Sequence, residues 1–170
     1  MPKTPVMKKN LTVAAVGALI MFIIMRWYGA GLQNPVSIRG IVDLEFADTP
    51  QRLYELLSRW DLSMVKMNIW LDFLFIVAYT VFFSIAAETC AEKWPEKTVP
   101  RQAGFFFARV AYVAGVLDIA ENLLMLQSIG GNFTGVSLQL TFYCAAIKFI
   151  LIAVIILYLL ASLPFVIKKK

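Results

Sequence analysis

Ionisable side chains lie inside three long apolar runs of this sequence, where charged groups are rare. They are Lys66, Asp72, Arg109, Asp118, Glu121 and Lys148. A charge at the centre of a hydrocarbon layer costs roughly 2.5–3.5 kcal/mol on insertion scales, so such residues are functional candidates by default. Lys66 and Arg109 lie near the ends of their runs and can extend toward the lipid headgroups. The other four cannot easily do so, and they are the first candidates for chemistry.

These four residues fall at similar depths when the runs are treated as helices. We measure depth from the outer side, the end of the helices that is joined by residues 29–63 and 129–137. With a rise of about 1.5 Å per residue, Asp72 lies roughly 12 Å deep and Glu121 roughly 10 Å deep. Asp118 and Lys148 both lie roughly 15 Å deep. Since successive helices alternate in direction, three separate segments bring their ionisable groups to one layer.

The helical faces agree with the depths. Asp118, Glu121 and Asn122 are spaced i, i+3 and i+4, so they share one face of a helix. Small residues continue this face at Ala114 and Gly115 and permit close approach of a neighbouring helix. We therefore predict one hydrogen-bonded binding or packing cluster. Its members are Asp72, Asp118, Glu121, Asn122 and Lys148.

The charges of this cluster do not balance, because three acids face one lysine. Either Arg26, Lys66 or Arg39 reaches the cluster from the outer side, or burial keeps one carboxyl protonated. In an enzyme, Asp118 or Glu121 is the candidate general acid or base, with Lys148 stabilising negative charge. The structural alternative is a packing role, since polar groups also hold membrane helices in register, at about 0.6–2 kcal/mol per hydrogen bond.

The composition indicates which elements must position these groups. The chain is 60% hydrophobic, above the roughly 45–50% of soluble domains, and about 20 apolar residues span a bilayer. We predict an all-α membrane protein, a four-helix transmembrane bundle in which residues 1–170 form a single domain. The expected spans are about 11–28, 64–87, 104–128 and 138–164. The first run could be a signal peptide, but the Arg26-Trp27-Tyr28 sequence at its end is typical of an interfacial anchor, which favours a retained helix.

Residues 29–63 form the longest connection and are expected to make a small outer cap. Apolar Val42 and Leu44 alternate with Asp43 and Glu45, which indicates a short extended segment. Asp43 and Glu45 could fold down as a lid over the cluster. The following Asp-Thr-Pro and the helical spacing of Leu53, Leu56, Leu57 and Trp60 predict an amphipathic helix on the outer surface.

The basic residues predict the orientation. Three lie in each of the N-terminal tail, the link 88–103 and the C-terminal tail, so the positive-inside rule places both termini in the cytoplasm. The expected partner is the lipid bilayer, with other membrane subunits or a lipid-like ligand as further possibilities and nucleic acid not expected. Histidine is absent, which argues against a His-ligated haem or metal and against a Ser-His or Cys-His pair. No metal site or other cofactor is predicted.

Four stretches carry a resemblance to known proteins. They are residues 42–50 (VDLEFADTP), 71–75 (LDFLF), 118–122 (DIAEN) and 148–149 (KF). Together they resemble a group of small bacterial four-span integral membrane proteins with no assigned function. The resemblance covers most of the chain from Val42 to about Lys148. It implies a bacterial inner membrane, and it implies no activity, cofactor or catalytic residue.

Three functional hypotheses follow. The leading one is a non-enzymatic membrane protein, either an accessory subunit of a larger membrane complex or a binder of a lipid-like ligand. The alternative is a small membrane enzyme that acts on a lipid or isoprenoid through Asp118 or Glu121. It requires a cavity at the depth of Lys148 that opens to lipid or outward. A third hypothesis is proton-coupled transport.

Overall fold

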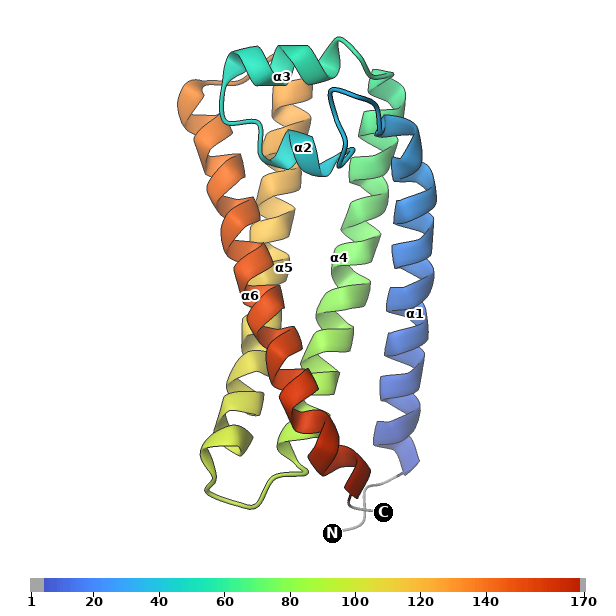
Figure 1. Ribbon diagram of the computed structural model, residues 1–170, viewed down its shortest axis with the longest axis vertical. Coiled ribbons are helices and arrows are strands. Elements are labelled where there is room, and N and C mark those ends of the chain that lie inside the picture. The colour runs from blue at the N-terminus through green and yellow to red at the C-terminus, as the bar shows by residue number, and fades with distance from the viewer. Residues whose placement is uncertain (1–4, 169–170) are drawn as a thin grey trace.

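The computed structural model describes residues 5–168, and it describes the side chains of residues 10–165. Within residues 5–168 the chain is all-helical and contains no β-strand. Four of the described helices are long and apolar enough to cross a membrane. They form a bundle with a small cap at one end (Figure 1), so the predicted all-α four-span fold is confirmed. The orientation argument rests on tail lysines whose side chains lie outside the described residues: Lys3, Lys8, Lys9, Lys168, Lys169 and Lys170.

The long helices extend beyond the predicted apolar spans. They are α1 (Pro5–Gly29), α4 (Leu62–Ala91), α5 (Val99–Ile129) and α6 (Gly135–Lys168). Hydropathy marks only the part of a helix that lies in hydrocarbon, whereas polar capping residues decide where the helix begins. At the start of α4, for example, the Asp61 side chain accepts a 2.8 Å hydrogen bond from the Ser63 backbone N–H. Each helix therefore continues into the flanking polar residues.

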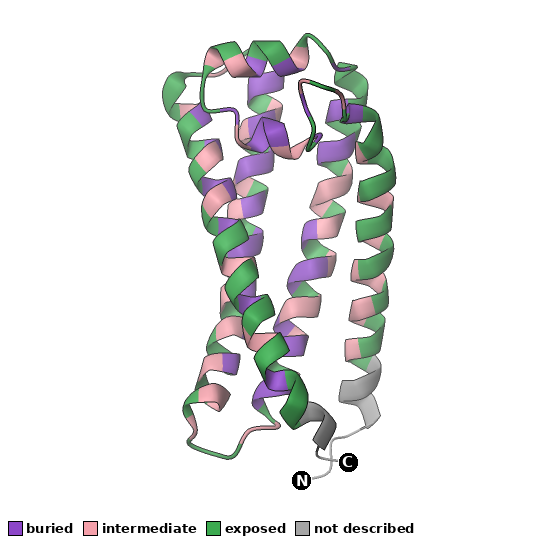
Figure 2. Ribbon diagram, in the orientation of Figure 1, coloured by how far each residue is buried: buried purple, intermediate pink, exposed green. Residues whose placement is uncertain are grey.

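Three of the long helices contact one another, and the fourth packs at their edge. α5 packs along both α4 and α6, which also contact each other, while α1 packs along α4 and not along α6 in the described part of the chain. Figure 1 shows α1 at the edge of the bundle beside α4. Between Asn10 and Gly29 no residue of α1 is fully buried, and the buried residues gather on α4, α5, α6 and the cap (Figure 2).

Small residues bring α4 and α5 close together. Ala91 of α4 and Ala108, Ala111 and Ala114 of α5 are all buried. A Cβ atom added to Gly104 would lie only 2.6 Å from the Cβ of Ala91, which is far inside van der Waals contact. This close approach aligns the polar face of α5 with that of α4.

The cap consists of the 3-10 turn η1 (Ala30–Leu32) and the short helices α2 (Val42–Glu45) and α3 (Pro50–Leu57). A hydrophobic core joins the cap to the bundle end, with Leu53 and Leu56 of α3 completely buried in it. The buried Trp60 ring donates a 2.7 Å hydrogen bond from Nε1 to the Leu32 carbonyl oxygen. The cap is therefore fixed to the helices rather than loosely tethered.

The predicted amphipathic helix is present as α3. Its N-cap is Thr49, whose side chain accepts a hydrogen bond from the Arg52 backbone N–H, and Pro50 occupies the first turn. Proline is favourable there because its missing N–H would have no partner in the helix.

The predicted extended segment is wrong, because residues 42–45 form the helical turn α2. The alternating pattern assumed that the acids face water, but Asp43, Leu44 and Glu45 are all buried. Gly40 adopts φ +64, a backbone conformation that suits glycine, and the Asp43 N–H then bonds to its carbonyl oxygen at 2.9 Å. Partners elsewhere in the fold bind both acids, and these tertiary contacts override the local pattern.

The close contact of α4 and α5 yields a stability prediction. Gly104→Ala should destabilise the protein by about 1–3 kcal/mol, the usual range for overpacking, because the added methyl meets both Ala91 of α4 and the Tyr158 hydroxyl of α6. Gly17→Ala in α1 is the matched control, since a Cβ there meets nothing within 4 Å, and alanine favours a helix by about 0.5–1 kcal/mol over glycine. Midpoints of denaturant-induced unfolding in detergent would compare them. Equal stability of the two variants would contradict the close helix contact.

Candidate functional site

Lys148 of α6 lies at the centre of a buried group of carboxyls. Its Nζ donates hydrogen bonds to Asp118 Oδ1 at 2.6 Å and to Glu121 Oε1 at 2.9 Å, both on α5. Glu45 Oε2 of the cap approaches the same nitrogen at 3.3 Å. That contact has ion-pair distance but lacks hydrogen-bond alignment, since Glu45 Oε2 has no hydrogen-bond partner among the described residues. One ammonium group therefore connects α5, α6 and the cap.

Two further contacts extend the polar layer to α4. The Tyr79 hydroxyl donates a 2.7 Å hydrogen bond to Asp118 Oδ2, so both oxygens of Asp118 are bound. Asn122 Nδ2 donates a 2.8 Å hydrogen bond to Asp72 Oδ2. The five residues predicted to cluster thus fall in two adjoining groups, one around Lys148 and one between Asp72 and Asn122. No hydrogen bond or ion pair of the described residues joins Asp72 to Lys148.

The two acids predicted as a lid behave differently. Glu45 reaches the Lys148 group from α2, whereas Asp43 turns to the cap itself. Asp43 accepts hydrogen bonds from the Arg39 backbone N–H at 3.0 Å, from Arg39 Nε at 2.8 Å and from the Ser37 hydroxyl at 3.2 Å. Burial acts to raise the pKa of Asp43, but these bonds outweigh it and hold that pKa below its usual value. Asp43 is therefore part of the cap structure.

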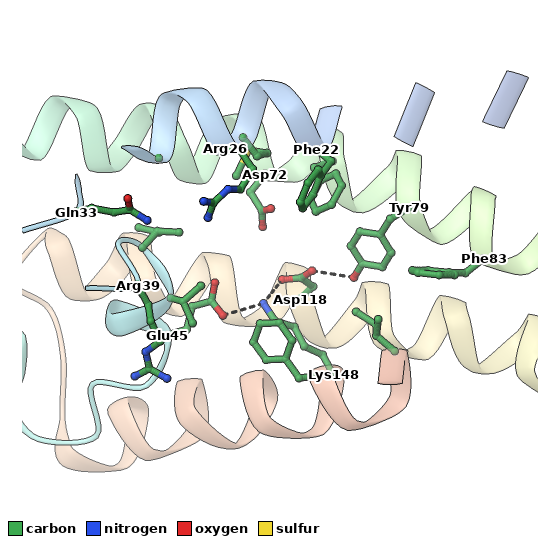
Figure 3. Close-up of a pocket in the computed structure, with 17 residues that line it drawn as sticks. Phe22, Arg26, Gln33, Arg39, Glu45, Asp72, Tyr79, Phe83, Asp118 and Lys148 are labelled. Carbon is green, nitrogen blue, oxygen red and sulfur yellow. Dashed lines mark hydrogen bonds and ion pairs between the residues drawn. The ribbon is translucent and has the colours of Figure 1, made fainter. Parts of the chain in front are cut away.

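A cavity of about 440 Å³ adjoins this polar layer. Figure 3 shows Glu45, Asp72, Asp118, Tyr79 and Lys148 around it, with Arg26 pointing in from α1. Its remaining wall is largely apolar and aromatic. The apolar lining residues are Phe22, Met25, Ile41, Val42, Phe75, Phe83, Phe149 and Ile152. The cavity therefore combines a charged region with an apolar wall.

The cavity reaches the molecular surface between α1 and α6. Both helices line it, yet they do not pack along each other in the described part of the chain. Phe22 of α1 and Phe149 of α6 line the cavity and are also 50% and 40% exposed. In a bilayer this side of the bundle faces lipid, so the opening connects the polar layer with the membrane interior.

The cations proposed to balance the acids are placed differently. Arg26 and Arg39 line the cavity, whereas Lys66 lies exposed on α4, as does Arg109 on α5. Arg39 binds Asp43 through Nε and Nη2 at 2.8 and 2.7 Å. Arg26 makes no hydrogen bond or ion pair with any residue that the structure describes.

Tyr79 belongs to the site through a contact that the sequence analysis did not assign. A buried tyrosine near an acid needs a hydrogen-bond partner, and this requirement was the available signal. Asn68 lies on the same helix, α4, and both polar atoms of its buried amide lack partners among the described residues. A second cavity of about 20 Å³ lies between Asn68, Glu45, Asp72 and Asn122. Its size and polar lining suit one buried water.

Comparison of the chain with protein-family models, with curated proteins and with solved structures found no match in any of the three. The class of the protein therefore follows from its own architecture. Its four long apolar helices and capped bundle are those of a helical integral membrane protein with a buried polar layer.

Removing the ammonium at the centre of the cluster should be severely destabilising. Lys148→Met leaves Asp118, Glu121 and Glu45 without their shared cation, and breaking a buried ion pair typically costs about 3–5 kcal/mol. The melting temperature of the purified protein in detergent should fall strongly. The same change at exposed Lys66 should have little effect, because Lys66 makes no such contact with the residues that the structure describes. A Lys148→Met protein as stable as Lys66→Met would refute the structural role of the cluster.

A second prediction concerns pH. Burial raises the pKa of Glu45 above its usual 4.5, Asp118 adds to this effect, and Lys148 opposes it. The folded protein thus retains a proton that the unfolded chain releases, so this contribution to stability is complete below pH 4.5 and is lost as pH rises through the raised pKa. Glu45→Gln cannot ionise, and its melting temperature should increasingly exceed that of the wild type as pH rises.

The exposed acid Glu55 of α3 provides the control for this experiment. Glu55→Gln should follow the wild-type melting temperature across the pH range. A constant difference between wild type and Glu45→Gln at all pH values would show that Glu45 keeps its usual pKa.

Proposed function

We propose that this protein is an integral membrane protein that binds a lipid-like ligand in the cavity between α1 and α6. The observation that carries the proposal is the cavity itself, which adjoins the charged layer and opens on the side of the bundle that faces lipid. An apolar part of the ligand would lie against the aromatic wall, and its polar group would lie beside Asp72 and Glu45. The cavity volume of about 440 Å³ falls in the usual range of roughly 300–1,000 Å³ for small-molecule sites.

A purely structural cluster explains fewer of these features. A polar group that only locks helices in register needs satisfied hydrogen bonds and close packing. Here the ion pairs of Lys148 are well formed, but Asp72 and Glu45 lie at the wall of an open space. An accessory subunit remains compatible with the fold, because the exposed faces of α1 could contact a larger protein as well as lipid.

The second candidate is a membrane enzyme that acts on a lipid or isoprenoid. It is favoured by one observation, the presence of carboxyls from Asp72, Asp118 and Glu45 at the cavity wall next to Lys148. Glu121 is completely buried and does not line the cavity, so Asp118 is the better placed acid–base residue. Incubation with lipids of the native membrane, followed by mass spectrometry, would test this function. Asp118→Asn should abolish any conversion that the wild type performs.

For the cellular setting we propose a bacterial inner membrane with both termini in the cytoplasm and the cap outside. The support for this orientation is the excess of basic residues in the tails and the link 88–103. α1 begins and α6 ends at the end of the bundle opposite the cap (Figure 1), so the two tails share one side.

The ligand proposal predicts a bound molecule in gently extracted protein. Native mass spectrometry of wild type should find one lipid-like mass per chain. Ile152→Trp fills the cavity, because Ile152 lies in its wall, and it should lose that mass. Ile150→Trp places the same ring on an exposed face of α6 and should retain it.

The alternatives give different spectra. Co-release with larger subunits in fixed ratio and no small ligand would support the accessory-subunit function. Equal retention of the ligand by both tryptophan variants would place the ligand outside the cavity and contradict the proposal.

A further inference from the structure

Acidic groups outnumber basic groups around the cavity and the polar layer behind it. The cavity lining holds three carboxyls, Glu45, Asp72 and Asp118, and three cations, Arg26, Arg39 and Lys148. Two further carboxyls behind the lining bind two of these cations, Asp43 binding Arg39 and Glu121 binding Lys148. In surroundings of low dielectric constant an unbalanced charge is expensive, and it is relieved by a proton or by an external cation. The region is therefore complementary to positive charge.

The cations that line the cavity are mostly committed to protein carboxyls. Lys148 donates hydrogen bonds to Asp118 and Glu121 and lies at ion-pair distance from Glu45, so three protein carboxyls share its charge. Arg39 is bound to Asp43. A ligand anion would therefore compete with protein carboxyls for Lys148 and Arg39, whereas Arg26 at the exposed rim has no such partner among the described residues.

Two of the carboxyls that line the cavity, in contrast to most of its cations, keep oxygen atoms that accept no hydrogen bond from the described residues. Asp72 uses one oxygen for Asn122, and no hydrogen bond among the described residues uses its other oxygen. Glu45 Oε2 is buried 3.3 Å from Lys148 Nζ, but it accepts no hydrogen bond from the described residues. Both residues line the same cavity, one from α4 and the other from α2. Asp72 is therefore the main acceptor for a ligand group, and Glu45 adds a carboxyl that shares Lys148 with two other acids.

Aromatic rings complete the surroundings of this acidic region. Phe22, Phe75, Tyr79, Phe83 and Phe149 line the cavity. The faces of aromatic rings attract cations, and a group of rings beside a carboxylate is the usual means of binding an ammonium group. The Lys148 ammonium already lies 5.0 Å from the centre of the Phe149 ring, so a cation in this region has precedent within the protein.

We infer that the ligand is a cationic amphiphile, whose ammonium group lies between Asp72, Glu45 and the aromatic rings and whose apolar chain extends toward the opening between α1 and α6. This inference rests on the proposed function, because it specifies the ligand of the same cavity. Arg26 at the rim opposes the positive charge and limits how strongly it is held.

Three matched photoreactive probes test the inference. They share one alkyl chain with a diazirine and end in a trimethylammonium, a hydroxyl or a carboxylate group. Labelling of cavity residues in detergent-solubilised protein would be located and quantified by peptide mass spectrometry. The trimethylammonium probe should saturate labelling at about tenfold lower concentration than the hydroxyl probe, and the carboxylate probe should be the weakest.

Two substitutions should shift this preference in opposite directions. Asp72→Asn removes one carboxylate with little change in shape, so the concentration advantage of the trimethylammonium probe should largely disappear. Arg26→Gln removes the competing cation at the rim, so the advantage should increase. Asp48→Asn, at an exposed cap residue, is the matched control and should leave the preference unchanged. Because the two effects have opposite signs, a general loss of stability cannot produce both.

Each other outcome overturns a distinct statement. Equal saturation by the trimethylammonium and hydroxyl probes would leave the cavity as a ligand site but refute selection for positive charge. Preference for the carboxylate probe would make Arg26 the binding group and refute the inference. Absence of saturable labelling with all three probes would refute the proposed function as well.

Discussion

The buried ammonium of Lys148 is the contact on which the arrangement of this membrane bundle depends. It joins Asp118 and Glu121 of α5 to α6 and draws Glu45 of the cap toward the same point. In hydrocarbon none of these groups could remain ionised alone at acceptable cost, so each requires the others in place. The cap must consequently bend inward at α2, and α5 and α6 must keep the register that brings their polar faces together.

The cavity follows from where this contact is placed. The ion pairs hold α5, α6 and the cap together, while the small residues hold α5 against α4, but neither device reaches α1. In the described part of the chain, α1 packs along α4 and meets the turn η1 but does not pack along α6, so the polar layer stays open on the side between α1 and α6. The same contacts that make the bundle stable therefore leave its charged layer accessible from the lipid-facing side.

Much of this arrangement could be predicted from the sequence, because helix geometry is regular. A fixed rise per residue gave Asp118 and Lys148 the same depth, and the i, i+3, i+4 spacing put Asp118, Glu121 and Asn122 on one face. The structure brings these groups together. The conformation of residues 42–45 could not be predicted in the same way. It depends on tertiary contacts with Lys148, which is distant in the sequence, and with Arg39, which precedes the turn at Gly40. The cavity could not be predicted from the sequence either, because no local pattern in α1 indicates which helix it packs against.

The excess of carboxyls distinguishes a binding site from a packing device in physical terms. A cluster selected only for helix packing gains most when its donors and acceptors match, because each unmatched buried charge reduces stability. Asp118 is matched in this way, with Lys148 on one oxygen and Tyr79 on the other. Asp72 has no cation partner among the described residues, and Glu45 shares Lys148 with two other acids; both lie at the cavity wall. The unmatched acids thus coincide with the open space, and a ligand that supplies the missing positive charge accounts for both features together.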